Sequence, residues 1–436
     1  MTPGAQIAAA IELLEDVHAK WDEGRAVPVD AMLGDYFRQR RFIGAKDKGF
    51  ISRRVYVVLR HGGALQWHIE KAGLPTTPRS LILAALVIEE KHPSSTLEQW
   101  FSGEGYDPDP LYVEEMRFAQ NADATDTADM PDWMRLNTPE WCMDRLRTLF
   151  GDALEAELTA LNEEAPLDMR VNTLKTTREA ARKALKKEGF DTELTPYSPW
   201  GLRLHRRGAL FNTQVFKDGW IEVQDEGSQL VTLLADPKPG QKVIDFCAGA
   251  GGKTLALAAM MQNKGRILAW DTAETRLEQG AKRLRRAGVD NVQRHAITSE
   301  NDSFIKRHKD SADVVLIDAP CSGSGTWRRN PDLKWRFDAS DLGEITAIQR
   351  NILDSAQRLV KKGGKLLYVT CSIFEEENES QVKQFLTKYP NFVIAGPSEI
   401  WNNDACSALS QSSDFLRLTP HRAGTDGFFA AILHKN

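Results

Sequence analysis

Long apolar runs are absent from this chain of 436 residues. No stretch approaches the roughly 18 uninterrupted apolar residues that a membrane helix needs. The apolar N-terminal run at residues 7–14 is interrupted by Glu12 and has no basic leader, which argues against a secretion signal. We therefore expect no membrane partner.

Cysteine and excess positive charge are also scarce. The five cysteines are odd in number and widely dispersed, so a disulfide framework is not expected. This usage favours a reducing cytoplasm, where free thiols stay available for chemistry. The 56 basic and 61 acidic residues give a net charge of −5, so the average charge does not indicate a nucleic-acid partner.

Local basic clusters carry more information than the average. They lie at residues 205–207, 283–286 and 327–336. A run of charge is usually a solvated face, and we interpret the first two clusters in this way. The third interleaves tryptophans with arginines and lysine directly after Cys321. Aromatic surfaces beside cations suit single-stranded nucleic acid, so we predict a contact of that kind here.

The pattern along the chain predicts three domains. Residues 1–130 are predicted to be helical, and residues 131–235 to form linker helices and a small α+β unit. Residues 236–436 are predicted to form the largest domain. An acidic, apolar-poor stretch at 121–131 is typical of a linker. Helical spacing marks residues 7–19, 47–60, 81–91, 139–160 and 177–188, and strands are predicted at 169–175 and 201–205.

From Pro239 onward, strands and helices alternate. Strands are predicted at 242–246, 266–270, 291–295, 313–317 and 365–370, and helices at 254–261, 275–287, 342–360 and 376–388. Such alternation predicts a Rossmann-like α/β domain, with a parallel sheet covered on both faces. Residues 427–433 are expected to add a final antiparallel edge strand.

A glycine-rich loop follows the first of these strands. The loop, residues 245–254, leads into a helix, an arrangement that lets a ligand approach backbone amides. A P-loop would need glycine at Cys247, and a dinucleotide fingerprint would need it at Thr254, so both patterns fail. Asp271 ends the second strand and could accept hydrogen bonds from a ribose, although an ordinary helix cap is the alternative. A nucleoside cofactor without pyrophosphate fits best, and S-adenosylmethionine is our prediction.

Two cysteines follow two predicted buried strands. Cys321 comes after the strand that ends at Asp318, and Cys371 ends the strand at 365–370. The carboxyl ends of such strands are where open α/β sheets bind ligands. A thiolate adding to carbon 6 of a pyrimidine makes carbon 5 nucleophilic enough to accept a methyl group. A carboxyl group such as that of Asp318 could hydrogen-bond the base meanwhile. The alternative, a small core hydrophobe, suits Cys142, Cys247 and Cys406 better.

Several motifs together resemble the RsmB/NOP/Sun family of RNA cytosine-C5 methyltransferases. The resemblance covers roughly residues 165–436, and the Pro-Cys and Thr-Cys pair is its most specific feature. The matching stretches are residues 224–229, 245–254, 318–332, 369–379 and 424–429. Residues 46–60 resemble the NusB-type helical RNA-binding domain that some bacterial members carry.

The resemblance implies a role for each site residue. Cys371 would attack carbon 6, and Cys321 would assist breakdown of the covalent intermediate. Asp318 would hold the cytosine edge and the cofactor, with Lys253 near the base. Asp271 would bind the ribose hydroxyls, and the loop would hold the rest of the cofactor through Cys247, Ala248, Gly249, Ala250, Gly251, Gly252 and Lys253. Chemistry alone leaves open which cysteine attacks.

The implied product is 5-methylcytosine in RNA, with 16S ribosomal RNA the favoured substrate and no metal expected. Alternatives are the same reaction on transfer RNA and a non-catalytic assembly factor that binds RNA. One departure supports the latter: residues 294–298 lack the acid that the family has after its third strand. Adenine recognition is then left to backbone groups or to Asp302.

Overall fold

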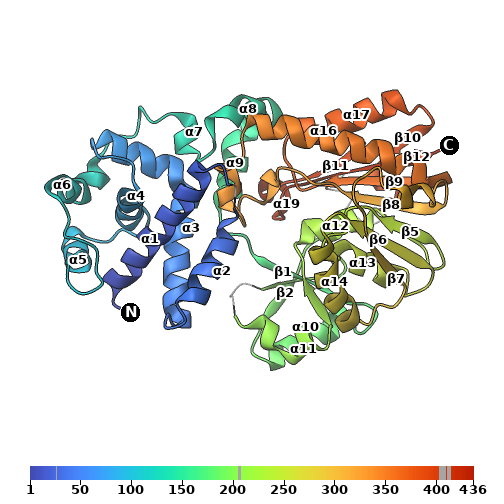
Figure 1. Ribbon diagram of the computed structural model, residues 1–436, viewed down its shortest axis with the longest axis horizontal. Helices are drawn as coiled ribbons and strands as arrows, with labels where there is room; N and C mark the ends of the chain where they lie inside the picture. The colour runs from blue at the N-terminus through green and yellow to red at the C-terminus, as the bar shows by residue number, and fades with distance from the viewer. Residues whose placement is uncertain (26, 205–207, 402–408, 410–413) are drawn as a thin grey trace. The chain divides into compact units, whose positions relative to one another are not determined.

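The computed structural model describes residues 1–25, 27–204, 208–401, 409 and 414–436. Its contacts group the chain into two compact units, Met1–Glu163 with Trp327–Ala339, and Glu164–Thr326 with Ser340–Asn436 (Figure 1). The predicted boundaries near residues 130 and 235 stay predictions. The acidic stretch at 121–131 lies inside the first unit, so the contacts show no boundary there.

The first unit is helical, as predicted. Its apolar core draws on the inner faces of α1, α3 and α4, including the fully buried Ile7, Ile51 and Leu83. In the part of the chain that the structure describes, no helix is both long and apolar enough to span a bilayer. The α-helices are α1 (Pro3–Asp22), α2 (Val29–Gln39), α3 (Ala45–Lys71), α4 (Pro78–Ala84), α5 (Ser94–Trp100), α6 (Val113–Asn121), α7 (Asp132–Arg135), α8 (Met143–Phe150) and α9 (Leu154–Asn162).

The aromatic and basic cluster at 327–336 packs into this helical unit. Lys334 is 1% exposed, and its Nζ donates to the backbone oxygens of Arg60 at 3.0 Å and Asn137 at 2.9 Å. The Nε1 of Trp335 donates to the Leu59 oxygen at 2.6 Å. Burial, and then the charge of Arg60, lower the pKa of Lys334 well below its ordinary value. The prediction of a free stacking surface for single-stranded nucleic acid is therefore wrong.

The other two basic clusters have different outcomes. Residues 205–207 lie outside the described residues. In the cluster at 283–286, Arg283 and Arg286 both form ion pairs with Glu222, whose side chain is 5% exposed. These two arginines are paired and partly buried, which differs from the solvated face that we predicted.

The second unit begins with a small antiparallel sheet of order β2-β3-β1-β4. Its strands are β1 (Leu167–Val171), β2 (Thr192–Leu194), β3 (Gly201–Leu204) and β4 (Ile221–Val223), and α10 (Arg178–Lys187) follows β1. The predicted strand at 169–175 is too long. Asn172 starts a turn in which its Oδ1 accepts the Leu174 N–H at 3.1 Å and its carbonyl accepts the Lys175 N–H at 3.0 Å.

The large sheet has the order β10-β12-β9-β8-β5-β6-β7, with β11 also paired to β12. The strands from β9 to β7 are parallel, as predicted. They are β5 (Lys242–Asp245), β6 (Arg266–Asp271), β7 (Val292–Ala296), β8 (Ala312–Asp318) and β9 (Val360–Thr370). The last strand, β12 (Phe428–Lys435), is antiparallel but does not form the edge. Two short strands that we did not predict, β10 (Phe392–Ala395) and β11 (Phe415–Leu418), cover its outer side.

Helices cover both faces of this sheet, which confirms the Rossmann-like class. Alternate strand residues face opposite cores: Val243 and Leu316 lie in one, Ile244 and Ile317 in the other. The first core contains α12 (Glu226–Leu233) and α13 (Gly252–Met260), and α14 (Glu274–Ala287) packs against β6 and β7. The second contains α15 (Ser303–Lys306), α16 (Ala339–Ala356) and α17 (Glu379–Lys388). Figure 1 shows α13 and α14 on the side opposite α16 and α17.

Candidate active site

The carboxyl ends of four parallel strands bring three predicted site residues, Asp271, Asp318 and Cys371, to one edge together with Asp245. Asp245 ends β5, Asp271 ends β6 and Asp318 ends β8. Asp318 pairs in register with Val369 of β9, so Cys371 emerges two residues further along the neighbouring strand. The edge therefore gathers three carboxylates and a thiol from segments far apart in sequence, as the strand pattern predicts.

The two cysteines meet at this edge. The Sγ atoms of Cys321 and Cys371 lie 3.4 Å apart, and both residues are partly exposed. Gly325 N–H donates to the Cys371 carbonyl at 2.9 Å, which ties the two loops together. The hydrogen bond with Cys371, burial and the charge of Glu377 raise the pKa of Cys321 well above its ordinary value. Cys321 is therefore held as a thiol.

Lys253 and Asp318 form an ion pair beside the cysteines. Lys253 Nζ lies 2.7 Å from Asp318 Oδ2, with the lysine side chain 9% exposed and the aspartate side chain 36% exposed. Burial alone would lower the pKa of Lys253, but the negative charges of Asp318 and of a Cys371 thiolate raise it above its ordinary value. Lys253 therefore stays charged, while the Asp318 carboxylate remains open to solvent.

The glycine loop needs its glycines for backbone reasons. Gly251 has φ +81° and caps the N-terminus of α13, and Gly249 has φ +52°. A Cβ atom at Gly249 would also lie 2.7 Å from an Nη2 of Arg276. Asp271 braces this turn, since its Oδ2 accepts the Gly249 N–H at 2.7 Å and its Oδ1 the Ala273 N–H at 2.8 Å. Asp271 thus holds the backbone of both loops in place, whether or not it also binds a ribose.

Asp245 is a site residue that the sequence analysis did not identify. It is fully buried, and its Oδ2 accepts the Thr254 hydroxyl at 2.6 Å. Its Oδ1 has no hydrogen-bond partner among the described residues. Burial raises the pKa of Asp245 to about 7. The position of this acid at the end of the first strand was the available signal.

Comparison with known proteins identifies the family of the chain that carries these residues. Residues 231–434 match the model of the family described as 16S rRNA methyltransferase RsmB/F, and residues 138–210 match the ferredoxin-like domain of RsmF/B-like methyltransferases. The crystal structure of a methyltransferase homolog from Pyrococcus horikoshii is 31% identical, covers 70% of this chain and 97% of its own, and superposes with a TM-score of 0.58. The chain belongs to the RsmB/F methyltransferase family.

Other relatives extend the comparison. A probable ribosomal RNA small subunit methyltransferase B from Synechocystis and a ribosomal RNA small subunit methyltransferase B from Pectobacterium carotovorum are each 34% identical. Each alignment covers 68% of this chain and 66% of the relative, slightly less than two thirds of the relative's length. The crystal structure of PH0851 covers 100% of this chain and 99% of its own, with 28% identity and a TM-score of 0.76.

S-adenosylmethionine is the cofactor of the RsmB/F family, and the residues of this edge fit it. The unpartnered, buried Oδ1 of Asp245 can accept a hydrogen bond from a ligand N–H group. A Cβ atom at Gly252 would have only Arg283 Nη2 nearby, at 4.0 Å, so the loop leaves open space above the start of α13. Burial raises the pKa of Cys247 well above its ordinary value, so this cysteine contributes as a neutral thiol.

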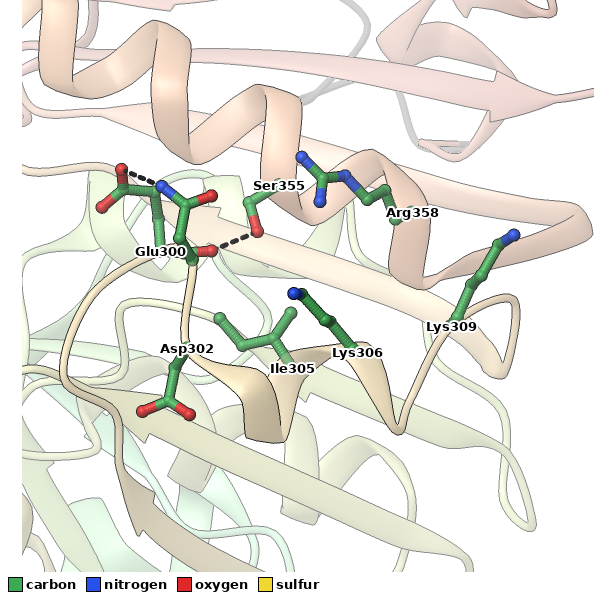
Figure 2. Close-up of a pocket in the computed structure, with 8 residues that line it drawn as sticks. Glu300, Asp302, Ile305, Lys306, Lys309, Ser355 and Arg358 are labelled. Atoms are coloured by element: carbon green, nitrogen blue, oxygen red, sulfur yellow. Dashed lines mark hydrogen bonds between the residues drawn. The ribbon is translucent and has the colours of Figure 1, made fainter.

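A separate pocket lies beside α15 and the C-terminal end of α16. Its cavity has a volume of about 290 Å³ and is lined by Glu300, Asn301, Asp302, Ile305, Lys306, Lys309, Ser355 and Arg358 (Figure 2). Glu300 and Asp302 follow the carboxyl end of β7, whereas Lys309 precedes β8 and Arg358 precedes β9, so the lining residues lie at both ends of α15. Asp302 uses its carboxylate to cap α15, accepting N–H bonds from Thr298 at 2.9 Å and Phe304 at 2.8 Å. Among the described residues that line this pocket, none is a cysteine, Lys253 or Asp318.

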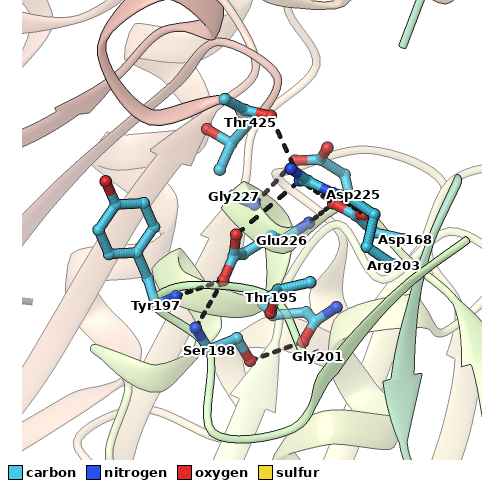
Figure 3. A network of polar contacts seen from close by, with 12 residues as sticks. Asp168, Thr195, Tyr197, Ser198, Gly201, Arg203, Asp225, Glu226, Gly227 and Thr425 are labelled. Atoms are coloured by element: carbon cyan, nitrogen blue, oxygen red, sulfur yellow. Dashed lines mark hydrogen bonds and ion pairs between the residues drawn. The ribbon is translucent and has the colours of Figure 1, made fainter. Parts of the chain in front are cut away.

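Two further motifs of the resemblance hold the unit together. The Asp168 carboxylate on β1 accepts hydrogen bonds from Arg203 Nε at 2.7 Å and from Arg203 Nη2 at 2.8 Å (Figure 3). Arg203 also donates to the Gly424 carbonyl at 3.3 Å. Glu226 is fully buried and accepts the N–H groups of Tyr197 and Ser198 at 2.7 and 2.6 Å. The stretches at 224–229 and 424–429 thus fasten the small sheet to the large one.

Proposed function

We propose that this RsmB/F chain is an S-adenosylmethionine-dependent RNA methyltransferase that forms 5-methylcytosine, with 16S ribosomal RNA as its substrate. The observation that carries the proposal is the pair of thiols 3.4 Å apart, next to the ion pair of Lys253 and Asp318. Family membership supports methyl transfer to RNA. The choice of cytosine and of carbon 5 rests on the chemistry of the thiol pair.

In this proposal Cys371 supplies the nucleophile. Its thiolate adds to carbon 6 of the cytosine, and carbon 5 then becomes the nucleophile toward the methyl group. S-adenosylmethionine supplies that methyl group when bound. The proton on carbon 5 then leaves to a base, and the bond between Cys371 and carbon 6 breaks. Cys321, whose sulfur lies 3.4 Å from that of Cys371, assists this elimination.

The electrostatic surroundings of the cysteines support this division of roles. A charge interaction with Cys371 helps to raise the pKa of Lys253, so the group beside Cys371 is a cation. Cys321 instead faces the carboxylate of Glu377, which disfavours its thiolate. The sequence chemistry left the attacking cysteine open, and this asymmetry favours Cys371.

Asp318 and Lys253 would handle the base and the cofactor. The exposed Asp318 carboxylate can accept hydrogen bonds from a cytosine amino group, and Lys253 holds it in place at 2.7 Å. As charge develops on the ring, the adjacent ammonium stabilises it. The glycine loop, with Asp271 at the ribose and Asp245 at an N–H donor, would bind the cofactor.

Incubation with tritiated S-adenosylmethionine and undermethylated ribosomal RNA tests the function directly. Digestion of the RNA should yield labelled 5-methylcytidine, and bisulfite sequencing should locate it. Labelling of transfer RNA in place of ribosomal RNA would show that transfer RNA is the substrate. Labelling of a nucleoside other than 5-methylcytidine would overturn the proposed carbon-5 chemistry.

A non-catalytic assembly factor is the second candidate, because no carboxylate occurs in residues 294–298 and Asp302 is engaged in capping α15. Calorimetry separates the two candidates. A scaffold need not bind S-adenosylmethionine, whereas the proposed enzyme must bind it.

A further inference from the structure

A single buried carboxylate contacts the residues that follow both cysteines. Glu377 is fully buried at the end of a short 3-10 turn, Glu375–Glu377. Ser322, directly after Cys321, donates its N–H to Oε1 at 2.8 Å and its hydroxyl to Oε2 at 2.5 Å. Ser372, directly after Cys371, donates its hydroxyl to the same Oε2.

Further hydrogen bonds close the network around this carboxylate. Gln349 on α16 donates to Oε1 at 3.0 Å and also to the Pro320 carbonyl at 2.9 Å. Ser324 Oγ accepts the Ile373 N–H at 2.9 Å and lies 3.1 Å from Ser372 Oγ. Glu377 thus receives four hydrogen bonds, about as many as two carboxylate oxygens can accept.

The network crosses between the two cysteine loops at several points. Asn378 extends it, because its Nδ2 donates to the Ser372 carbonyl at 2.9 Å and its Oδ1 accepts the Thr370 hydroxyl at 2.5 Å. A buried charge of this kind is a weak source of stability, since an apolar side chain of equal volume would often serve as well. The Glu377 carboxylate instead acts on geometry, because one group holds both cysteine loops.

We propose that Glu377 is a positioning residue that sets the separation of the Cys321 and Cys371 sulfurs. This inference rests on the proposed function. With the sulfurs held 3.4 Å apart, Cys321 lies next to the bond that Cys371 forms with carbon 6 of the base. The charge of Glu377 also contributes to the raised pKa of Cys321.

The substitution Glu377→Gln tests this role with little change of shape. The amide oxygen can replace Oε1, where the Ser322 N–H and Gln349 donate. The amide NH₂ group then replaces Oε2, so the hydroxyls of Ser322 and Ser372 must turn to accept. The loops lose the charged acceptor that joins them, and we expect elimination to slow more than attack.

Thiol proximity is measured first, with no RNA or cofactor present. Diamide takes one hydrogen from each of two thiols while one S–S bond forms, and peptide mapping identifies the Cys321–Cys371 disulfide. We expect Glu377→Gln to slow this disulfide about tenfold, as a looser sulfur geometry would. Glu375→Gln is the matched control, because Glu375 is exposed and, among the described residues, forms an ion pair with Lys383 alone, at 3.3 Å. The control should react at the wild-type rate.

The second measurement follows the reaction with labelled RNA. Glu377→Gln should raise the fraction of protein covalently bound to RNA several-fold relative to wild type and to Glu375→Gln. An unchanged disulfide rate together with an unchanged adduct fraction would overturn the proposal. If the wild-type protein methylates no cytosine, the proposed function fails, while the diamide rates still decide the positioning role.

If Glu377→Gln does not fold, two smaller substitutions test the same role. Ser322→Ala and Ser372→Ala each remove one hydroxyl donor to Glu377. Each should slow disulfide formation in the same direction by a smaller factor. Wild-type rates in both variants would count against the proposal.

Discussion

Cys321 and Cys371 place their sulfurs 3.4 Å apart, yet opposite charges flank them. Lys253 interacts with Cys371, and Glu377 with Cys321. Two identical side chains therefore have different electrostatic surroundings, and the anion disfavours a thiolate at Cys321. This asymmetry supports the proposed assignment of attack to Cys371 and of release to Cys321.

Cys371→Ser should abolish methyl transfer, because a hydroxyl is a far weaker nucleophile than a thiolate. Affinity for S-adenosylmethionine should stay at the wild-type level, since the predicted cofactor residues lie elsewhere on the edge. Incorporation of labelled methyl groups measures the loss of transfer, and calorimetry measures the affinity for S-adenosylmethionine. Cys142→Ser, at a buried cysteine of the helical unit, is the control and should retain activity. Full incorporation by Cys371→Ser would contradict the assignment.

Lys253→Met should lower kcat/KM by roughly 100-fold or more, the scale of a lost catalytic group. The change removes the cation that holds Asp318 at 2.7 Å and that favours the Cys371 thiolate. Combining it with Asp318→Asn should cost less than the sum of the two single effects, because the pair acts together. Steady-state kinetics of the single and double variants measure this coupling. Lys264→Met, at an exposed lysine, is the control. Additive effects would show that the two residues act independently.

Asp245 should make stability depend on pH. Its pKa is raised to about 7 in the folded state, so between about pH 4 and pH 7 the folded protein holds a proton that the unfolded chain has lost. Stability therefore falls as pH rises through this window and levels off above it. Urea unfolding across that range should show the slope, and Asp245→Asn should reduce it. The exposed Asp290→Asn should leave it unchanged. An equal slope in Asp245→Asn would place the titration elsewhere.

Asp168→Ala should destabilise the protein by about 3 kcal/mol, because it leaves Arg203 without its main partner in a largely buried site. The lost contacts are the two bonds from Arg203 and the one from the Glu226 N–H at 3.2 Å. Lys383→Ala breaks the exposed pair with Glu375 and should change stability by less than about 0.5 kcal/mol. Equal effects of the two variants in urea unfolding would show that the buried network is not stabilising.

The main helices and strands, and the residues at the strand ends, could be predicted from the sequence. Apolar runs of strand length predicted β5, β6, β8 and β9, and parallel pairing then required Asp318 and Cys371 to share an edge. The prediction that β12 forms the edge of the sheet was wrong, because β10 and β11 are too short to show a strand pattern in the sequence.

Burial and partner choice were not readable from the sequence. Lys334 and Trp335 look like nucleic-acid contacts in isolation, and only packing against α3 shows that Lys334 is buried and Trp335 partly buried. Glu377 lies in a run of three acidic residues, of which only this one is fully buried. Charge patterns cannot distinguish such a residue from its exposed neighbours.

The covalent adduct of Cys321→Ala tests the account most directly. The variant should still attack cytosine through Cys371 but release it slowly, so a protein–RNA complex should persist on a denaturing gel. The double variant Cys321→Ala/Cys371→Ala should show none. Accumulation that depends on Cys371 is the predicted result. Absence of the adduct in Cys321→Ala, or its persistence without Cys371, would contradict the division of roles between the two cysteines.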